Sequence, residues 1–227
     1  MAEVRVEPVA QPRVKICCIA SVDEAWTAIQ AGASALGLVS QMPSGPGVIE
    51  EQLIHDIATQ TPPAIGTFLL TCEQDAEKII PQQRRCRTNT IQICDALTSG
   101  TYQQLREAMP GIALVQVIHV IGEQSIDAAC AVAPHVHAIL LDSGNPALAV
   151  KELGGTGRRH DWQISRRIRE AVHVPTFLAG GLRPENVTEA IEIVRPFGLD
   201  VCSGVRTDGR LDEAKLTAAM AAVRAAS

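Results

Sequence analysis

The sequence predicts a single α/β domain built as a (β/α)8 TIM barrel. Eight short apolar segments alternate with eight amphipathic segments along the 227 residues, and no further domain interrupts them. Apolar strands that alternate with helices indicate a parallel sheet, and eight such units are what a barrel requires. The alternative, a doubly wound open sheet, needs fewer strands and a glycine-rich turn after the first strand. Here that turn reads Cys17-Cys18-Ile19-Ala20, without glycine.

The first strand and helix show how each element is recognised. Residues 14–19 are a buried apolar run, and Ser21 with Glu24 is the capping box that starts a helix. Gly32 ends that helix. The expected strands cover residues 14–19, 35–39, 64–70, 90–94, 113–120, 138–141, 176–179 and 199–202. The expected helices cover the segment between Ser21 and Gly32 and residues 50–59, 73–83, 99–109, 123–133, 162–171, 184–195 and 212–227.

Composition and charge exclude several classes of protein. The net charge is −5 and the Lys and Arg residues cluster only in pairs, which argues against a nucleic-acid-binding surface. No apolar run reaches the roughly 18 residues of a membrane helix, and the N-terminus lacks the apolar core of a signal peptide. We therefore expect a cytoplasmic protein with no nucleic-acid or membrane partner, and the sequence leaves open whether it is a monomer or a homodimer.

Residues 1–12, with Pro8 and Pro12, are expected to be a loose lead-in to a barrel formed by residues 13–227. The seven cysteines are an odd number without C-x-x-C spacing, which favours free thiols over a disulfide framework or a zinc site. The six histidines are spread over positions that make no set of metal ligands, so we expect no metal.

The stretch from Ala138 to Trp162 organises the predicted site. Its apolar strand ends on Asp142, a polar loop follows, and Gly154-Gly155-Thr156-Gly157 precedes the next helix. The carboxyl ends of parallel strands are where barrels place their chemistry, so Asp142 is a candidate general acid, general base or hydroxyl acceptor. A simple cap of the following loop is the weaker alternative.

Glycine-rich loops follow the last three strands. Backbone N–H groups of such loops bind phosphate in many barrels, whereas the alternative is three unrelated tight turns. Their occurrence on adjacent loops favours a phosphorylated small-molecule ligand. The expected binding residues are Gly155, Thr156, Gly157, Gly180, Gly181, Ser203 and Gly204.

Three further residues are ambiguous from their positions alone. Asp200 lies within the last strand and is either functional or a loop cap. Cys17 ends the first strand and is either a base or nucleophile, or an inert buried thiol; the adjacent Cys18 leaves open which of the two faces the barrel. Lys15 either neutralises an acid inside the barrel or is a structural charge.

Taken together, the motifs of the chain resemble the phosphoribosylanthranilate isomerase family, from about residue 14 to residue 223. The resemblance is carried by Val14-Lys-Ile-Cys17, Ala31-Gly-Ala33, Ala35-Leu-Gly37, Leu140-Leu-Asp142, Gly154-Gly-Thr-Gly157 with Asp161-Trp162, Leu178-Ala-Gly-Gly-Leu182, Pro184-Glu-Asn-Val187 and Asp200-Val-Cys-Ser-Gly-Val205. The family converts an aminoaldose phosphate into an aminoketose phosphate by an Amadori rearrangement, without a cofactor, in tryptophan biosynthesis.

The resemblance implies a role for each site residue. Asp142 would be the general acid that protonates the ribose ring oxygen, and Cys17 the general base that removes the proton next to the imine carbon. Asp200 would hold the hydroxyls or the amine of the substrate, and the glycine loops its phosphate. Because Cys17 would act as a thiolate, Lys15 or a polar neighbour is expected to lower its pKa.

The chain departs from the family where the aromatic carboxylate is recognised. The K-I-C-G motif of the family has Cys18 in place of glycine. The S-P-R segment, whose Arg binds the anthranilate carboxylate, is replaced by residues 44–47, Ser-Gly-Pro-Gly. The Q-L-H-G segment is replaced by residues 92–95, so its His is lost and Asp95 would repel a carboxylate. Arg183 or Arg206 could compensate, although Arg206 follows a glycine loop and is expected nearer the phosphate.

The main hypothesis is therefore an isomerase of this family, or a paralogue that acts on another phosphorylated aminosugar. A second hypothesis is a non-catalytic barrel that binds a phosphorylated metabolite. A third is a lyase that uses Lys15 as a Schiff-base amine, which we rank last because Lys15 lies deeper in the barrel than Cys17.

Overall fold

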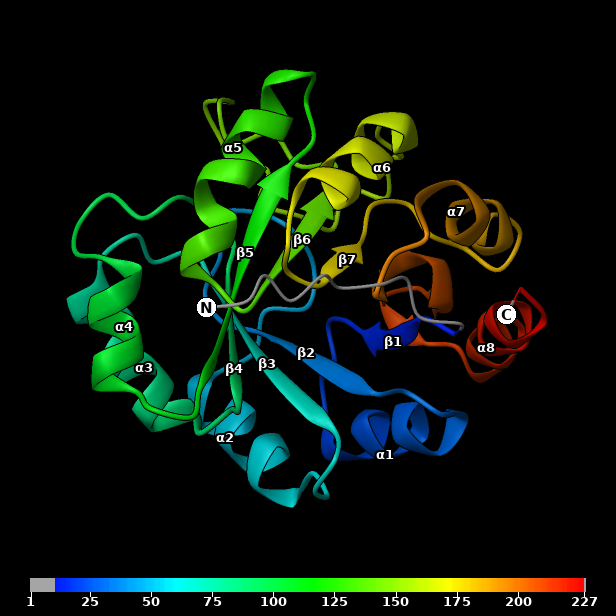
Figure 1. The fold of residues 1–227 in the computed structure, drawn as a ribbon. Helices are drawn as coiled ribbons and strands as arrows, with labels where there is room; N and C mark the ends of the chain where they lie inside the picture. Colours follow the sequence, from blue (N-terminus) through cyan, green and yellow to red (C-terminus); the bar gives the residue numbers. More distant parts are fainter. Residues whose placement is uncertain (1–10, 227) are drawn as a thin grey trace.

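The computed structural model describes residues 11–226, so residues 1–10 of the expected lead-in at residues 1–12 lie outside the described residues. The parallel strands β1 to β8 form a closed barrel in sequence order, as Figure 1 shows. The strands are β1 (Arg13–Ile16), β2 (Ala35–Val39), β3 (Gly66–Thr71), β4 (Thr90–Ile93), β5 (Ala113–His119), β6 (Ala138–Asp142), β7 (Thr176–Leu178) and β8 (Gly198–Val201). The prediction of a (β/α)8 barrel is confirmed, and the pairing of β1 with β8 excludes an open sheet.

A helix follows each strand and packs on the outside of the barrel (Figure 1). The helices are α1 (Val22–Ala31), α2 (Glu51–Gln60), α3 (Ala76–Cys86), α4 (Tyr102–Ala108), α5 (Gln124–Val132), α6 (Trp162–Ala171), α7 (Val187–Val194) and α8 (Glu213–Ala225). Between β8 and α8, the short strands β9 (Arg206–Thr207) and β10 (Arg210–Leu211) form a two-stranded hairpin.

Capping residues set most of the helix starts. Ser21 accepts a hydrogen bond from the backbone N–H of Glu24, and the Glu24 carboxylate accepts one from the N–H of Ala20. Helix α3 begins later than the sequence predicted because Asp75 is its N-cap and accepts from the N–H of Glu77. These bonds satisfy N–H groups that have no partner within the helix.

The first strand is shorter than predicted: it ends at Ile16 rather than at residue 19. Cys18 adopts the left-handed conformation, with a φ of 62°, which turns the chain out of the sheet. Cys17 and Cys18 therefore lie in the loop after β1, at the end of the barrel where the candidate site residues gather.

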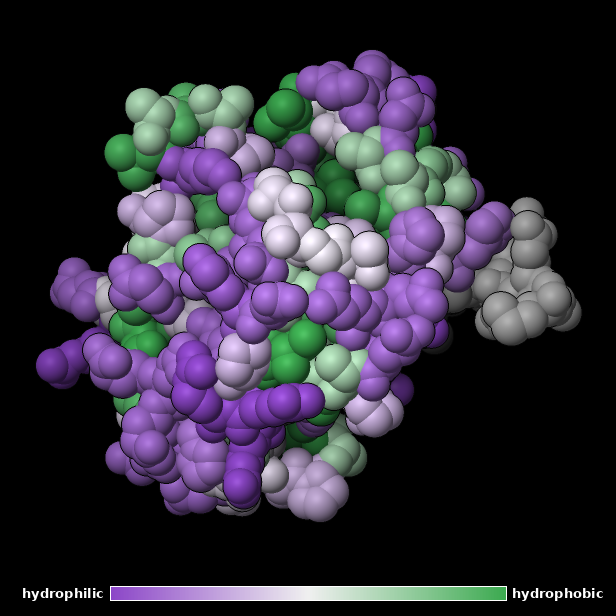
Figure 2. Space-filling view, turned by 90° about the vertical axis from the view of Figure 1, so that its left-hand side faces the viewer, coloured by the Kyte–Doolittle hydropathy of each residue, from purple (hydrophilic) through white to green (hydrophobic). Residues whose placement is uncertain are grey.

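Apolar side chains fill two layers, one between the sheet and the helices and one inside the barrel. Inside the barrel, Phe177 makes edge-to-face contacts with Phe68 and Phe197, with ring centroids 5.9 and 5.5 Å apart. The face that carries α3 and α4 is mostly hydrophilic (Figure 2), as expected for helices that bury one side. Within residues 11–226, no helix is long and apolar enough to cross a membrane.

Candidate active site

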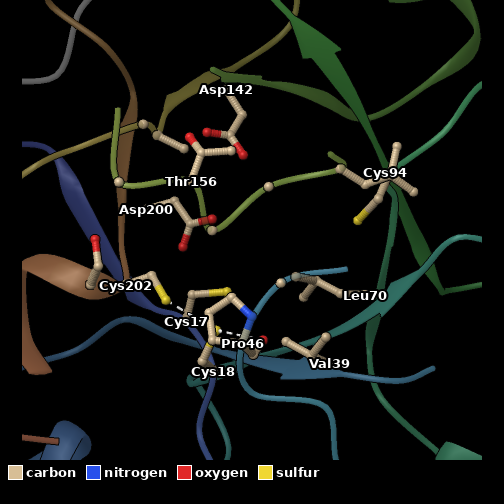
Figure 3. A pocket seen from close by; sticks show the side chains of 18 of the residues that line it. Cys17, Cys18, Val39, Pro46, Leu70, Cys94, Asp142, Thr156, Asp200 and Cys202 are labelled. Carbon is tan, nitrogen blue, oxygen red and sulfur yellow. Dashed lines mark hydrogen bonds between the residues drawn. The ribbon is translucent and has the colours of Figure 1, made fainter. Parts of the chain in front are cut away.

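A pocket lies at the carboxyl ends of the barrel strands and contains both predicted carboxylates and Cys17 (Figure 3). Asp142 is the last residue of β6, Asp200 belongs to β8, and Cys17 follows β1. The residues that line the pocket are Cys17, Cys18, Val39, Met42, Ser44, Gly45, Pro46, Leu70, Gln92, Cys94, Asp142, Leu153, Gly154, Gly155, Thr156, Gly157, Ala179, Gly180, Gly181, Leu182, Asp200, Cys202 and Ser203. Of the predicted site residues, Lys15 and Gly204 do not line it.

Lys15 lies below the pocket and supports Asp200. The two residues are partners in the register of β1 and β8, and the Lys15 Nζ atom lies 2.8 Å from Asp200 Oδ2. Burial opposes the charge on Lys15, but the neighbouring Asp200 carboxylate raises the Lys15 pKa above its ordinary value. Lys15 therefore remains a cation, as the prediction that it neutralises an acid requires.

Asp200 offers one free oxygen to the pocket. Burial and the nearby Cys17 raise its pKa to about 7, although Lys15 opposes that shift. Its Oδ1 atom is buried and has no hydrogen-bond partner within residues 11–226. A buried oxygen without a partner is costly in the absence of a ligand, so this atom is suited to accept a hydrogen bond from a substrate hydroxyl or amine.

Asp142 has the protonation behaviour of a general acid. Burial raises its pKa to about 6, even though the N–H of Ser143 donates to Oδ1 at 2.7 Å and His119 lies nearby. A carboxyl group whose pKa lies near the working pH is protonated often enough to donate and is regenerated easily.

Gly37 makes room for Lys15 and Cys17 inside the barrel. A Cβ atom at this position of β2 would lie 2.8 Å from Cys17 Sγ and 3.0 Å from Lys15 Nζ. Both side chains therefore occupy the space beside Gly37 of β2 that a side chain at this position would fill. The glycine of the Ala35-Leu-Gly37 motif thus has a direct structural role at the site.

The sulfur atoms of Cys17, Cys18 and Cys202 form a cluster at one side of the pocket (Figure 3). Cys202 Sγ lies 3.0 Å from Cys18 Sγ, within hydrogen-bond distance, and Cys18 Sγ lies 3.5 Å from the carbonyl oxygen of Pro46. Hydrogen bonds from Cys17 and Cys18 hold the pKa of Cys202 well below its usual range. Of the three thiols, Cys202 is therefore the one that ionises most readily.

The pKa of Cys17 is raised rather than lowered. A hydrogen bond with Cys18 and the charge of Lys15 lower it, but Cys202 and burial outweigh them. The expected effect of Lys15 is thus present but insufficient. Both Cys17 and Cys18 line the pocket, so neither is turned away from it.

The three glycine-rich loops converge on one another. A Cβ atom on Gly181 would lie 2.9 Å from the carbonyl oxygen of Gly157, and one on Gly157 would lie 3.5 Å from Ser203 Oγ. Gly204 is packed beneath this point, where a Cβ atom would lie 2.0 Å from the carbonyl oxygen of Leu182. Three separate turns would not need such close approach, so the convergence supports the predicted phosphate site.

The opposite side of the pocket is apolar. Val39, Met42, Leu70, Pro46 and Leu153 line it, and none of the described lining residues is Lys or Arg. The loop of residues 44–47 is fastened to the loop after β6, because Ser44 Oγ donates to the carbonyl of Lys151 over 2.7 Å.

Arg206 supports the loop after β1 and does not line the pocket. Its guanidinium donates to the carbonyl oxygens of Cys17 and Cys18 and pairs with the Glu24 carboxylate at 3.2 Å. The expectation that Arg206 lies near the phosphate is therefore not met. Its contacts instead hold the left-handed turn at Cys18.

Asp95 is paired with the Lys151 cation. Lys151 Nζ lies 2.5 Å from Asp95 Oδ2 and 3.5 Å from the side-chain oxygen of Gln74. The carboxylate that was expected to repel an anionic substrate is therefore neutralised. Lys151 lies in an irregular loop 56 residues from Asp95, and no motif signals that pairing.

Sequence reasoning selected neither Cys202, which lines the pocket, nor His119, which lies beside Asp142. His119 is the register partner of Asp142, and its Nε2 atom lies 2.9 Å from the carbonyl oxygen of Cys94. Within residues 11–226, no group of three His, Cys, Asp or Glu residues is placed to hold a metal ion.

Comparison with known proteins identifies a consistent set of relatives. A family model described as N-(5'-phosphoribosyl)anthranilate (PRA) isomerase matches residues 14–222. N-(5'-phosphoribosyl)anthranilate isomerase 2 of Methanosarcina mazei is 37% identical over 206 residues, which cover 90% of each chain.

Solved structures of phosphoribosylanthranilate isomerases are also similar to this chain. The phosphoribosylanthranilate isomerase of Thermotoga maritima is 27% identical, with a TM-score of 0.78 over 94% of this chain and 99% of that one. A phosphoribosylanthranilate isomerase in complex with reduced 1-(o-carboxyphenylamino)-1-deoxyribulose 5-phosphate is 25% identical, with a TM-score of 0.75 over 94% of this chain and 99% of that one.

Proposed function

The chain belongs to the N-(5'-phosphoribosyl)anthranilate isomerase family and is an aldose–ketose isomerase of tryptophan biosynthesis, and we propose that Asp142 and Cys17 are its acid–base pair. The observation that carries this proposal is the pKa of Asp142, raised to about 6 by burial in the pocket that also contains Cys17 and the glycine loops.

The proposed reaction has two proton transfers. Asp142 protonates the ribose ring oxygen; the C1–O bond breaks as the amine nitrogen donates its lone pair, and a protonated Schiff base forms. Cys17, as thiolate, then removes the proton from C2, and the electrons of that C–H bond form the C1–C2 double bond. Tautomerisation of the resulting enolamine gives the aminoketose.

The groups around Cys17 set how readily it forms the thiolate that the second step needs. The neighbouring Cys202 and burial raise the Cys17 pKa, whereas a hydrogen bond with Cys18 lowers it. The positive charge of Lys15 stabilises that thiolate.

The remaining groups bind the substrate. We propose that Asp200 Oδ1 accepts a hydrogen bond from the sugar or its amine, and that the backbone N–H groups of the glycine loops bind the phosphate. The aromatic ring is assigned to the apolar side of the pocket, around Val39, Leu70 and Leu153. Lys151 neutralises Asp95, so Asp95 does not repel the carboxylate carried by the aromatic ring of the substrate.

The lyase hypothesis is disfavoured by the state of Lys15. A Schiff-base lysine must be neutral to attack a carbonyl. Lys15 is fully buried, paired with Asp200, and has a raised pKa, so it remains protonated.

Turnover of phosphoribosylanthranilate by the purified protein, followed as loss of the anthranilate-type fluorescence, tests the proposal. We expect turnover by the natural protein and a loss of about 10²- to 10⁴-fold in Asp142→Asn. Phosphate should still raise the unfolding temperature of that variant, because the phosphate loops are intact. Phosphate binding without turnover in the natural protein would instead support the metabolite-binding hypothesis. Turnover unchanged in Asp142→Asn would remove Asp142 as the acid.

A further inference from the structure

Two of the clustered thiols belong to segments far apart in the chain. Cys18 lies in the loop after β1 and Cys202 directly after β8, 184 residues later, and their sulfur atoms lie 3.0 Å apart. The proposed reaction uses neither as the base. Cys18 also occupies a left-handed position, which favours glycine and costs about 1 kcal/mol or more for other residues.

The pair is both reachable and reactive. Both residues line the pocket, and Cys202 is only partly buried. Hydrogen bonds from Cys17 and Cys18, together with the charge of Arg206, hold the pKa of Cys202 well below its usual range. The thiolate is the form of cysteine that oxidants attack, and an adjacent thiol can resolve the oxidised product.

We propose that Cys18 and Cys202 are a modification site at which a peroxide forms a reversible disulfide that inactivates the isomerase. The loss of activity rests on the function proposed above, whereas the disulfide itself does not.

The chemistry requires only the peroxide as oxidant. The Cys202 thiolate attacks one peroxide oxygen; an S–O bond forms, the O–O bond breaks, and the leaving oxygen takes up a proton to become water. The Cys18 sulfur then attacks Cys202 Sγ; the S–S bond forms, the S–O bond breaks, and a second water leaves with the Cys18 proton. The two sulfurs lose two electrons and the peroxide gains them. A dithiol reverses the reaction by exchange.

The geometry needs a small movement. A disulfide bond is about 2.0 Å long, so the two sulfurs must approach by about 1 Å from their present separation of 3.0 Å. Cys18 would give up its weak hydrogen bond to the carbonyl of Pro46. Strands β1 and β8 are hydrogen-bonded neighbours, so the bond would cross the point at which the barrel closes.

Oxidation acts on the reaction through Cys17 and the phosphate loop. It changes the hydrogen bonds that Cys17 makes with Cys18 and Cys202, the two thiols that help to set the pKa of the proposed base. The disulfide also links Cys18, the neighbour of Cys17, to Cys202, the residue that precedes Ser203. We therefore expect loss of turnover on oxidation and recovery with dithiothreitol.

The experiment is a titration of the full chain with hydrogen peroxide, followed by maleimide labelling and intact mass under non-reducing conditions. We expect two fewer reactive thiols per chain, and a peptide link between Cys18 and Cys202 after proteolysis. Cys18→Ser and Cys202→Ser should each abolish the link. Cys130→Ser, which removes the exposed thiol of α5, should retain it and serves as the matched control. The cross-link should also raise the unfolding temperature, since it restricts the unfolded chain over 184 residues.

Failure would be plain in the same data. A link that joins Cys17 instead, oxidation confined to Cys130, or a full count of free thiols after treatment would each overturn the proposal. Because thiol counting needs no substrate, a disulfide in a protein that does not turn over phosphoribosylanthranilate would contradict only the proposed function.

Discussion

Replacing Asp142 with Asn should make the protein more stable at neutral pH while it removes the proposed general acid. Asp142 is buried, and burial raises its pKa from the ordinary value of 3.8 to about 6. The folded state therefore holds the proton more tightly than the unfolded state, and ionisation of Asp142 opposes folding. An Asn side chain has nearly the same shape, carries no charge, and can still accept the hydrogen bond from Ser143.

The size of the expected stabilisation follows from the shift in the Asp142 pKa. A difference of about two pH units corresponds to about 3 kcal/mol at about 1.4 kcal/mol per unit. This penalty is small at pH 4, grows as the pH rises towards 6, and is fully present above that. Asp142→Asn should thus be more stable than the natural protein by up to about 3 kcal/mol at pH 8, which for a chain of this size is about 5–10 °C in unfolding temperature.

Urea unfolding of both proteins at pH 4 and pH 8 measures the difference directly. Asp212→Asn is the matched control, because Asp212 caps α8 and its pKa is lowered by the Thr207 hydroxyl and the Lys215 N–H. A lowered pKa means that ionisation favours folding, so this variant should lose stability at pH 8 relative to pH 4. The reasoning would be refuted if Asp142→Asn were less stable than the natural protein at pH 8, or if its free energy of unfolding differed from that of the natural protein by the same amount at both pH values.

Two other substitutions test the surroundings of the site. Gly37→Ala places a methyl group 2.8 Å from Cys17 Sγ, which should cost about 1–3 kcal/mol of stability and lower kcat. Gly66→Ala, the control, inserts a methyl group into β3 away from the site and should leave kcat unchanged. Equal kcat values for the two variants, measured under conditions in which both are folded, would contradict this. Lys151→Ala leaves the Asp95 carboxylate without its cation, so KM for the anionic substrate should rise about tenfold. KM should fall back in a double variant that also carries Asp95→Asn. An unchanged KM in Lys151→Ala would show that this pair does not influence substrate binding.

The sequence predicted the barrel because each strand is a continuous apolar run between turn residues, and this signal is local. Asp142 could be placed by the same local rule, since it follows Leu141 at the end of such a run. The phosphate loops were visible from local glycine patterns: Gly181 stands shortly after the end of β7, and Gly155 belongs to the glycine-rich segment between β6 and α6.

What the sequence could not predict depends on contacts between distant segments. The pairing of Lys15 with Asp200 requires the register at which β1 meets β8. The approach of Cys202 to Cys18 depends on the same closure, and on the left-handed turn that Arg206 stabilises through its hydrogen bonds. No local pattern encodes these distances.

The most direct test of the proposed acid–base pair is a single-turnover measurement with substrate deuterated at C2. The natural protein should release the deuterium to solvent as the aminoketose forms. Cys17→Ser and Asp142→Asn should each slow turnover by about 10²- to 10⁴-fold, whereas Cys94→Ser, which alters another buried thiol of the pocket, should release deuterium at close to the natural rate. Unimpaired release of deuterium by Cys17→Ser would contradict the assignment of Cys17 as the base.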